Sequence, residues 1–112
     1  MEKNVKDFNI SPKANLVEAD LGGLNLSGAD LRGADLRKVN MMETNLEEAN
    51  LKGANMAGAN LAWANLMGAD LSDANLVGAN LDQADMTGAK LVDANLIRAN
   101  LGYANLTAAI LP

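Results

Sequence analysis

Large apolar side chains recur at every fifth position from Leu16 to Leu111, and all twenty are leucine or methionine. Two positions before each stands a small residue, which is alanine in seventeen of the twenty cases. Asn or Asp occupies the position between them, except at Lys90 and Ile110. In an α-helix a step of five residues rotates a side chain by about 140° beyond a full turn, which would spread the leucines around the whole helix. A flat strand fails as well, because strict alternation is interrupted once in every repeat. The pattern predicts three alternating residues followed by a two-residue corner, so that the chain turns every five residues.

The corner residues are of two kinds. Glycine stands at the third position of eight of the Leu-x-y-Ala tetrapeptides, where a type II turn needs positive φ. Other corners carry larger residues, among them Trp63 and Tyr103. We expect these corners to use turns with negative φ, so the sequence predicts two turn classes in one coil.

Tandem A[D/N]LXX repeats over residues 14–111 resemble the pentapeptide-repeat proteins. The resemblance implies an all-β fold, a right-handed quadrilateral β-helix with four repeats per coil and therefore about five coils. It also implies that the leucine and the small residue point inward while the other three residues of each repeat face solvent.

Both ends of the chain depart from the repeat. Residues 1–13 are predicted to form an N-terminal cap, and residues 14–112 a single repeat domain. Phe8-Asn9-Ile10 looks like one more repeat, but Ile10 lies six residues before Leu16, so we interpret Pro12 or Lys13 as an inserted residue. At the other end, the apolar Ile110 and Leu111 are candidate dimer contacts. The alternative is that the natural chain continues beyond Pro112 and covers them.

Composition narrows the possible functions. The chain has no cysteine and no histidine, which removes thiolate nucleophiles, imidazole bases and the usual zinc ligands. We therefore expect no enzyme, no metal and no cofactor. The net charge of −5 argues against nucleic-acid and anionic-membrane partners. The N-terminal residues lack the apolar stretch of a secretory signal, so the expected location is cytoplasmic.

Two aromatic residues suggest where a partner protein could bind. Residues twenty apart are expected to stack, which places Glu43, Trp63, Gln83 and Tyr103 in one corner column, with Met42 in the column beside it. Large aromatic residues favour interfaces, so this column is the candidate interaction surface. The alternative is that both rings lie flat and shield the aliphatic edge of the coil.

The sequence favours a scaffold for protein–protein contact, with an unknown protein partner and a possible homodimer through the C-terminal coil. The alternative is a binder of type II topoisomerase that mimics duplex DNA, as some members of the family do. The acidic net charge fits that alternative, but one side of the expected coil carries a slight excess of cations.

Overall fold

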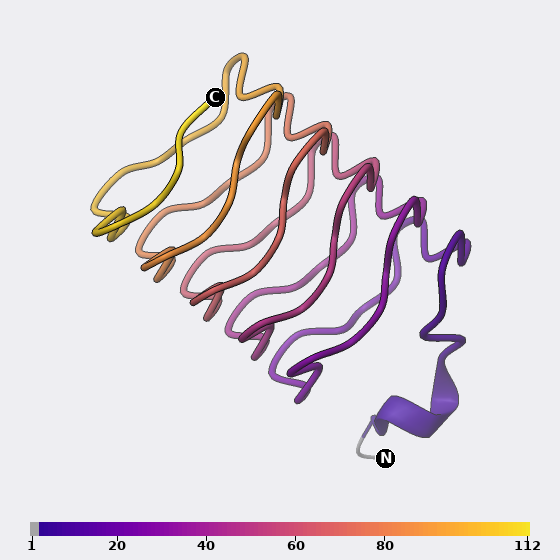
Figure 1. Ribbon diagram of the computed structural model, residues 1–112. Coiled ribbons are helices and arrows are strands. Elements are labelled where there is room, and N and C mark those ends of the chain that lie inside the picture. Colours follow the sequence, from indigo (N-terminus) through magenta and orange to yellow (C-terminus); the bar gives the residue numbers. More distant parts are fainter. Residues whose placement is uncertain (1–2) are drawn as a thin grey trace.

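The computed structural model describes residues 3–112, and it shows a solenoid whose principal extents are 36 × 23 × 23 Å (Figure 1). Parallel β-bridges join residues twenty positions apart, from Asn15 paired with Asp35 to Lys90 paired with Ile110. Twenty residues contain four repeats, so four repeats make one turn of the solenoid. This is a β-helix with a turn every five residues, as the pattern predicts, and with the four repeats per coil that the resemblance implies.

Each side of the solenoid is short, and backbone hydrogen bonds hold it to the next coil. In the repeat centred on Leu61, the leucine amide donates to the carbonyl of Asn80 at 2.7 Å and the Trp63 amide donates to that of Asp82 at 2.9 Å. In return, the Asn80 amide donates to the carbonyl of Ala59 at 2.8 Å. Each side contributes a single bridged residue, so the described residues contain isolated bridges rather than longer strands.

The core is a stack of leucine, methionine and alanine. Fourteen leucine and methionine side chains of the repeat centres between Leu21 and Leu91 are 0% exposed. Thr44 is the one buried polar residue of the described chain, and its hydroxyl donates to the carbonyl of Leu21 at 2.8 Å. Burial weakens at the C-terminal end, where Leu96, Leu101 and Leu106 are only partly buried.

The prediction of two turn classes is wrong. Every corner from Glu18 to Ala108 has a positive φ at its third position, whether or not the residue is glycine, and the values lie between 55° and 72°. Trp63 has a φ of 61°. The corners therefore share one backbone conformation, with the positive φ that a type II turn requires.

The ladder of backbone hydrogen bonds between successive coils explains why non-glycine residues adopt positive φ at the corners. At Trp63 a negative φ would turn the amide away from the Asp82 carbonyl, and it would break the register with the next coil. A left-handed conformation costs a non-glycine residue roughly 1–2 kcal/mol. A buried backbone group that loses its hydrogen bond costs about as much or more, so the regular ladder decides the conformation.

The Asn and Asp residues stabilise the same corners. In each repeat the side-chain Oδ1 accepts the backbone amide two residues later, as Asn60 does from Ala62 at 3.1 Å. Lys90 cannot accept this bond, and the Val92 amide accordingly has no such acceptor. These Asx turns explain why the position between alanine and leucine is so uniform.

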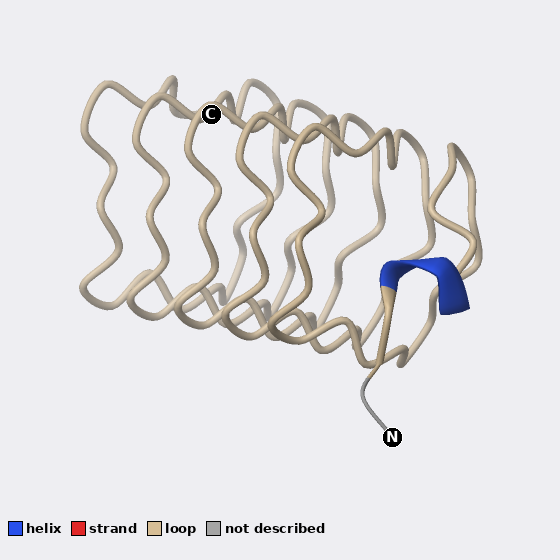
Figure 2. Cartoon of the chain, turned by 90° about the horizontal axis from the view of Figure 1, so that it is seen from below, coloured by secondary structure: helices blue, strands red, loops and turns tan. Residues whose placement is uncertain are grey.

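Short 3-10 helix η1, Val5–Asp7, lies at one end of the stack (Figure 2). Phe8 and Ile10, which follow it, are partly buried against the core. The interpretation of Pro12 or Lys13 as an insertion is wrong. Lys13 has a φ of 61° and its amide donates to the carbonyl of Arg32 at 2.8 Å, as at a regular corner. The Ala14 amide closes that turn on Ser11 at 3.2 Å, so the irregular residue lies before Ser11.

Candidate interaction surface

The candidate residues predicted from the sequence lie on one side of the solenoid. We call this side the second face; it consists of residues 20–23, 40–43, 60–63, 80–83 and 100–103. The Glu43 amide donates to the carbonyl of Ala62, and the Gln83 amide donates to that of Gly102, each within 3.0 Å. The Trp63 amide continues the same ladder, so Trp63 and Tyr103 stand two coils apart, about 9.6 Å at the usual strand spacing.

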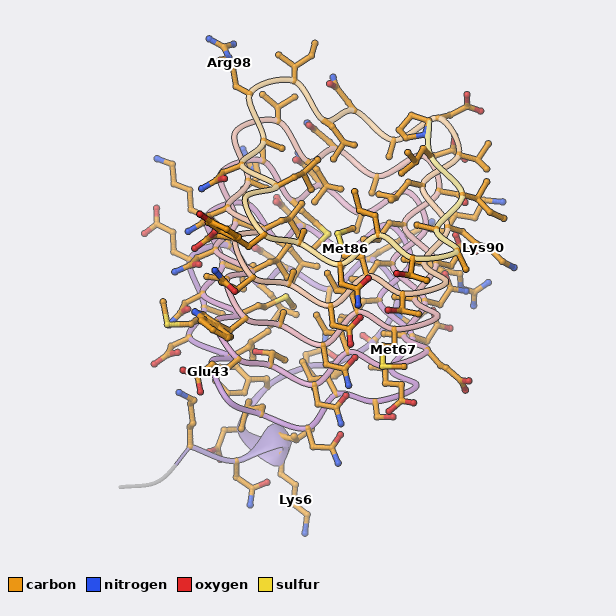
Figure 3. All side chains as sticks on the ribbon, turned by 90° about the vertical axis from the view of Figure 1, so that its left-hand side faces the viewer. Lys6, Glu43, Met67, Met86, Lys90 and Arg98 are labelled. Carbon is orange, nitrogen blue, oxygen red and sulfur yellow. The ribbon has the colours of Figure 1, made fainter. Side chains whose placement is uncertain are left out.

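Exposure differs along this column. Trp63 is 60% exposed and Tyr103 is 86% exposed, whereas Gln83 between them is partly buried. Met42, in the adjoining column, is 40% exposed. We use the name aromatic strip for Met42, Glu43, Trp63, Gln83 and Tyr103. In Figure 3, Glu43 projects on the side of the coils opposite Lys90, and Met67 lies between them.

The second face carries carboxylates but no lysine or arginine among its own residues. Its acids are Asp20, Glu43 and Asp82. Asp20 accepts the Gly22 amide at 3.1 Å and pairs with Lys3 of the N-terminal segment at 3.2 Å, and these contacts lower the pKa of its carboxyl. Glu43 and Asp82 have no ion-pair partner among the described residues. The aromatic strip is therefore flanked by negative charge.

The structure gives Asp82 a definite place on this face. Its Oδ1 lies so close to Gly102 that a Cβ there would come within 2.9 Å of it. The Asp82 carboxylate thus lies over the bare backbone next to Tyr103. The signal in the sequence was Gly102, one of only two glycines that stand at the second rather than the third corner position.

Two of the three arginines are paired within their own repeats. Arg32 binds Asp30 and Arg37 binds Asp35, each at 2.7 Å. Hydrogen bonds from the guanidinium groups hold the pKa of both aspartates below the ordinary value. These charges are already compensated, in contrast to those beside the aromatic strip.

The last coil, residues 92–111, is the second place where apolar groups gather. Five of the nine exposed large hydrophobic side chains of the described chain belong to it, including Ile110 at 51% and Leu111 at 56% exposure. In the earlier coils the corresponding amides donate to the next coil, as that of Leu61 does to Asn80. In the described chain the amides of Leu96, Leu101 and Leu106 donate to no backbone carbonyl. The two candidate dimer residues thus lie at an open edge.

The exposed groups on these two surfaces include aromatic, apolar and acidic side chains. Within residues 3–112, no three His, Cys, Asp or Glu residues are grouped so that they could hold a metal ion. The same residues include no helix with the length and apolarity needed to cross a bilayer. Their buried polar side-chain atoms all have hydrogen-bond partners.

Known proteins resemble the chain in both sequence and fold. The family model of pentapeptide repeats, which describes eight copies, matches residues 14–53, 42–73 and 74–111. The crystal structure of a pentapeptide repeat protein from Nostoc PCC 7120 is 30% identical, with a TM-score of 0.64 over 90% of this chain and 86% of that one. A second, from the thylakoid lumen of Arabidopsis thaliana, is 28% identical, with a TM-score of 0.52 over 87% of this chain and 69% of that one. A search of curated proteins gave no match. On the family match and the repeat geometry together, the chain belongs to the pentapeptide-repeat family.

Proposed function

We propose that the protein is a non-enzymatic scaffold for protein–protein contact and that the aromatic strip is its contact surface. The observation that carries this proposal is the exposure of Trp63 and Tyr103 on a rigid ladder. Exposed aromatic side chains supply much of the binding energy at protein interfaces. A backbone that is already ordered loses little entropy on binding, which favours affinity.

We also propose the finer architecture that goes with this role. Twenty repeats would form five coils of a right-handed helix, with residues 1–13 as the cap of a single repeat domain, 14–112. Partial burial of Val5, Phe8 and Ile10 against the core supports the cap. A stack of repeats needs such a cover, because its first coil otherwise exposes both core and backbone.

Replacing Trp63 and Tyr103 together by alanine should abolish partner binding without unfolding the protein. The bait would be immobilised protein and the prey a lysate of the source organism, with retained proteins identified by mass spectrometry. Each retained protein would then be purified and its affinity measured by calorimetry. We expect at least a tenfold loss of affinity in the double variant, because two exposed anchor residues are removed.

The matched control is Ile97→Ala together with Val92→Ala, which shortens two exposed side chains outside the second face. This control should bind the purified partner as the wild type does. Equal affinity of all three proteins for every purified candidate would overturn the proposal, as would a failure to reconstitute any complex.

Self-association through the last coil is proposed as a second contact. The double substitution Ile110→Asp, Leu111→Asp places charges where two exposed apolar side chains now lie. We expect light scattering to report a dimer for the wild type and a monomer for the variant. A monomer in both proteins would end this part of the proposal and leave the aromatic strip unaffected.

The structure does not favour the alternative of a topoisomerase binder that mimics DNA. Duplex DNA is negative on all sides. In this solenoid the exposed cations Lys13 and Lys52 lie away from the second face, since the Lys13 amide bonds to Arg32 and the Gly33 amide to Lys52, while Arg32 itself pairs with Asp30. The surface is therefore acidic on the second face and mixed in charge elsewhere.

A further inference from the structure

Two aromatic residues of the second face each follow a carboxylate residue on the preceding coil, in the same column for Trp63 and in the adjoining column for Tyr103. Glu43 precedes Trp63 by one rung of the ladder. Asp82 lies over Gly102, the residue next to Tyr103. An aromatic face with a carboxylate beside it is suited to a cation, because the ring attracts the charge and the carboxylate pairs with it. The second face therefore offers two cation subsites, each formed by an aromatic residue and a carboxylate residue of the preceding coil.

The distance between these subsites is set by the backbone. Two rungs of the ladder span about 9.6 Å. A polyproline II segment rises about 3.1 Å per residue with three residues per turn, so every third side chain points the same way at intervals of about 9.3 Å. An extended strand repeats at about 6.7 Å, and an α-helix at about 5.4 Å per turn or about 10.8 Å over two turns, so the polyproline II interval matches the two rungs most closely.

We propose that the aromatic strip binds a polyproline II segment that carries arginine at every third position. One guanidinium stacks on Trp63 and pairs with Glu43, and the next stacks on Tyr103 and pairs with Asp82. Arginine suits both subsites, because its planar guanidinium stacks on aromatic rings and binds carboxylates at two points. The inference rests on the proposed function, since it names the kind of partner that the aromatic strip would accept.

The surroundings of the aromatic strip suit this partner. The second face has no lysine or arginine of its own to repel or compete with the ligand, apart from the Lys3 side chain that pairs with Asp20. Gln83 lies between Trp63 and Tyr103 in the column, and its side-chain carboxamide is available to hydrogen-bond the backbone of the ligand. The backbone amides of Glu43, Trp63 and Gln83 are already used by the ladder, so recognition along these three residues falls to the side chains.

The test uses three synthetic peptides with four arginines each and proline at all other positions. Arginine recurs every second residue in one, every third in the next and every fourth in the last. All three form polyproline II helices of equal charge, but only the period of three places the arginines on one face. Trp63 is the only tryptophan, so its fluorescence reports occupancy directly.

We expect the period-three peptide to bind the wild-type protein at least tenfold more tightly than either of the other two. Tyr103→Ala should weaken that peptide at least fivefold and reduce the preference for its spacing. Ile97→Ala, an exposed apolar residue of the same coil on another face, should leave binding unchanged. Circular dichroism of each variant would establish that the β-helix is intact.

Equal affinity for the three peptides would overturn the inference, even if Tyr103→Ala weakened all of them, because the match of spacings would then have no effect. Absence of binding by all three peptides would overturn it as well. Neither result bears on the capture experiment above, which identifies partners without assuming their conformation. Failure of the inference and failure of the scaffold proposal can therefore be told apart.

Discussion

A single alanine inserted between Ser72 and Asp73 will abolish the cooperative unfolding transition of the whole solenoid. If the inserted residue takes the corner position, every later residue moves by one place. Asp73 and Asn75 then face the core, and Leu76 faces solvent. The shift affects every repeat that follows, so the loss is not confined to one coil.

The expected size of the effect follows from the burial of the displaced side chains. Leu76, Leu81, Met86 and Leu91 are each 0% exposed. Exposing a large apolar side chain costs roughly 1.5–3 kcal/mol, so these four together lose about 6–12 kcal/mol. The whole free energy of unfolding of a small domain is about 5–15 kcal/mol. Thermal melting followed by circular dichroism is the measurement.

Two further variants keep this prediction testable. A corner can release an extra residue as a bulge, whereas an alanine between Asn75 and Leu76 cannot be released without breaking the amide bonds of these residues to Ala54 and Asn95. Duplication of residues 74–93 adds twenty residues and keeps the register, so it should leave the transition cooperative. A melting temperature unchanged by both single insertions would show that the register argument is wrong.

Replacing Glu18, Lys38 and Arg98 by glycine should raise the stability of the protein. These residues hold φ values of 59°, 55° and 58°. The left-handed conformation costs a non-glycine residue roughly 1–2 kcal/mol, which glycine avoids. Glycine has more conformational entropy in the unfolded chain, and this lowers the gain in stability by about 0.4–1 kcal/mol per site. The net gain is about 2 kcal/mol for the three sites, or roughly 10 °C in melting temperature for a domain of this size.

The matched control for the glycine variant replaces the same three residues by alanine. It removes the same charges and side chains but keeps the Cβ that makes positive φ unfavourable. This control should not be more stable than the wild type. If the alanine and glycine variants melt at the same temperature, the corners are not strained as their φ values imply.

The repeat pattern was enough to predict a turn of the chain every five residues, and the resemblance to pentapeptide-repeat proteins added the β-helix with four repeats per coil. The prediction of negative φ at the non-glycine corners is wrong, because residues other than glycine also adopt positive φ there. A better signal was present in the sequence. Six of the nineteen second corner positions carry a β-branched residue, such as Val17 or Ile97, while the third positions carry none. Residues branched at Cβ are the ones that tolerate positive φ least.

The candidate surface was predictable as a column, because residues twenty apart must stack once the coil contains four repeats. The position of the Asp82 carboxylate over Gly102 was not predictable. It depends on the rotamer of one side chain and on the space left by a missing Cβ, and neither follows from the period of the repeat. The exposed fractions of Trp63 and Tyr103 likewise needed the coordinates.

The ladder gives the solenoid a direction. In each repeat two amides donate toward the C-terminal end, as those of Leu61 and Trp63 do, and one amide of the next coil donates back, as that of Asn80 does. The C-terminal rim therefore presents two donors for every acceptor, and the opposite rim has the reverse excess. Two C-terminal rims placed face to face cannot satisfy one another through their backbones alone. A dimer at that end must be held by side chains such as Ile110 and Leu111, while water or carboxylates accept the remaining amides.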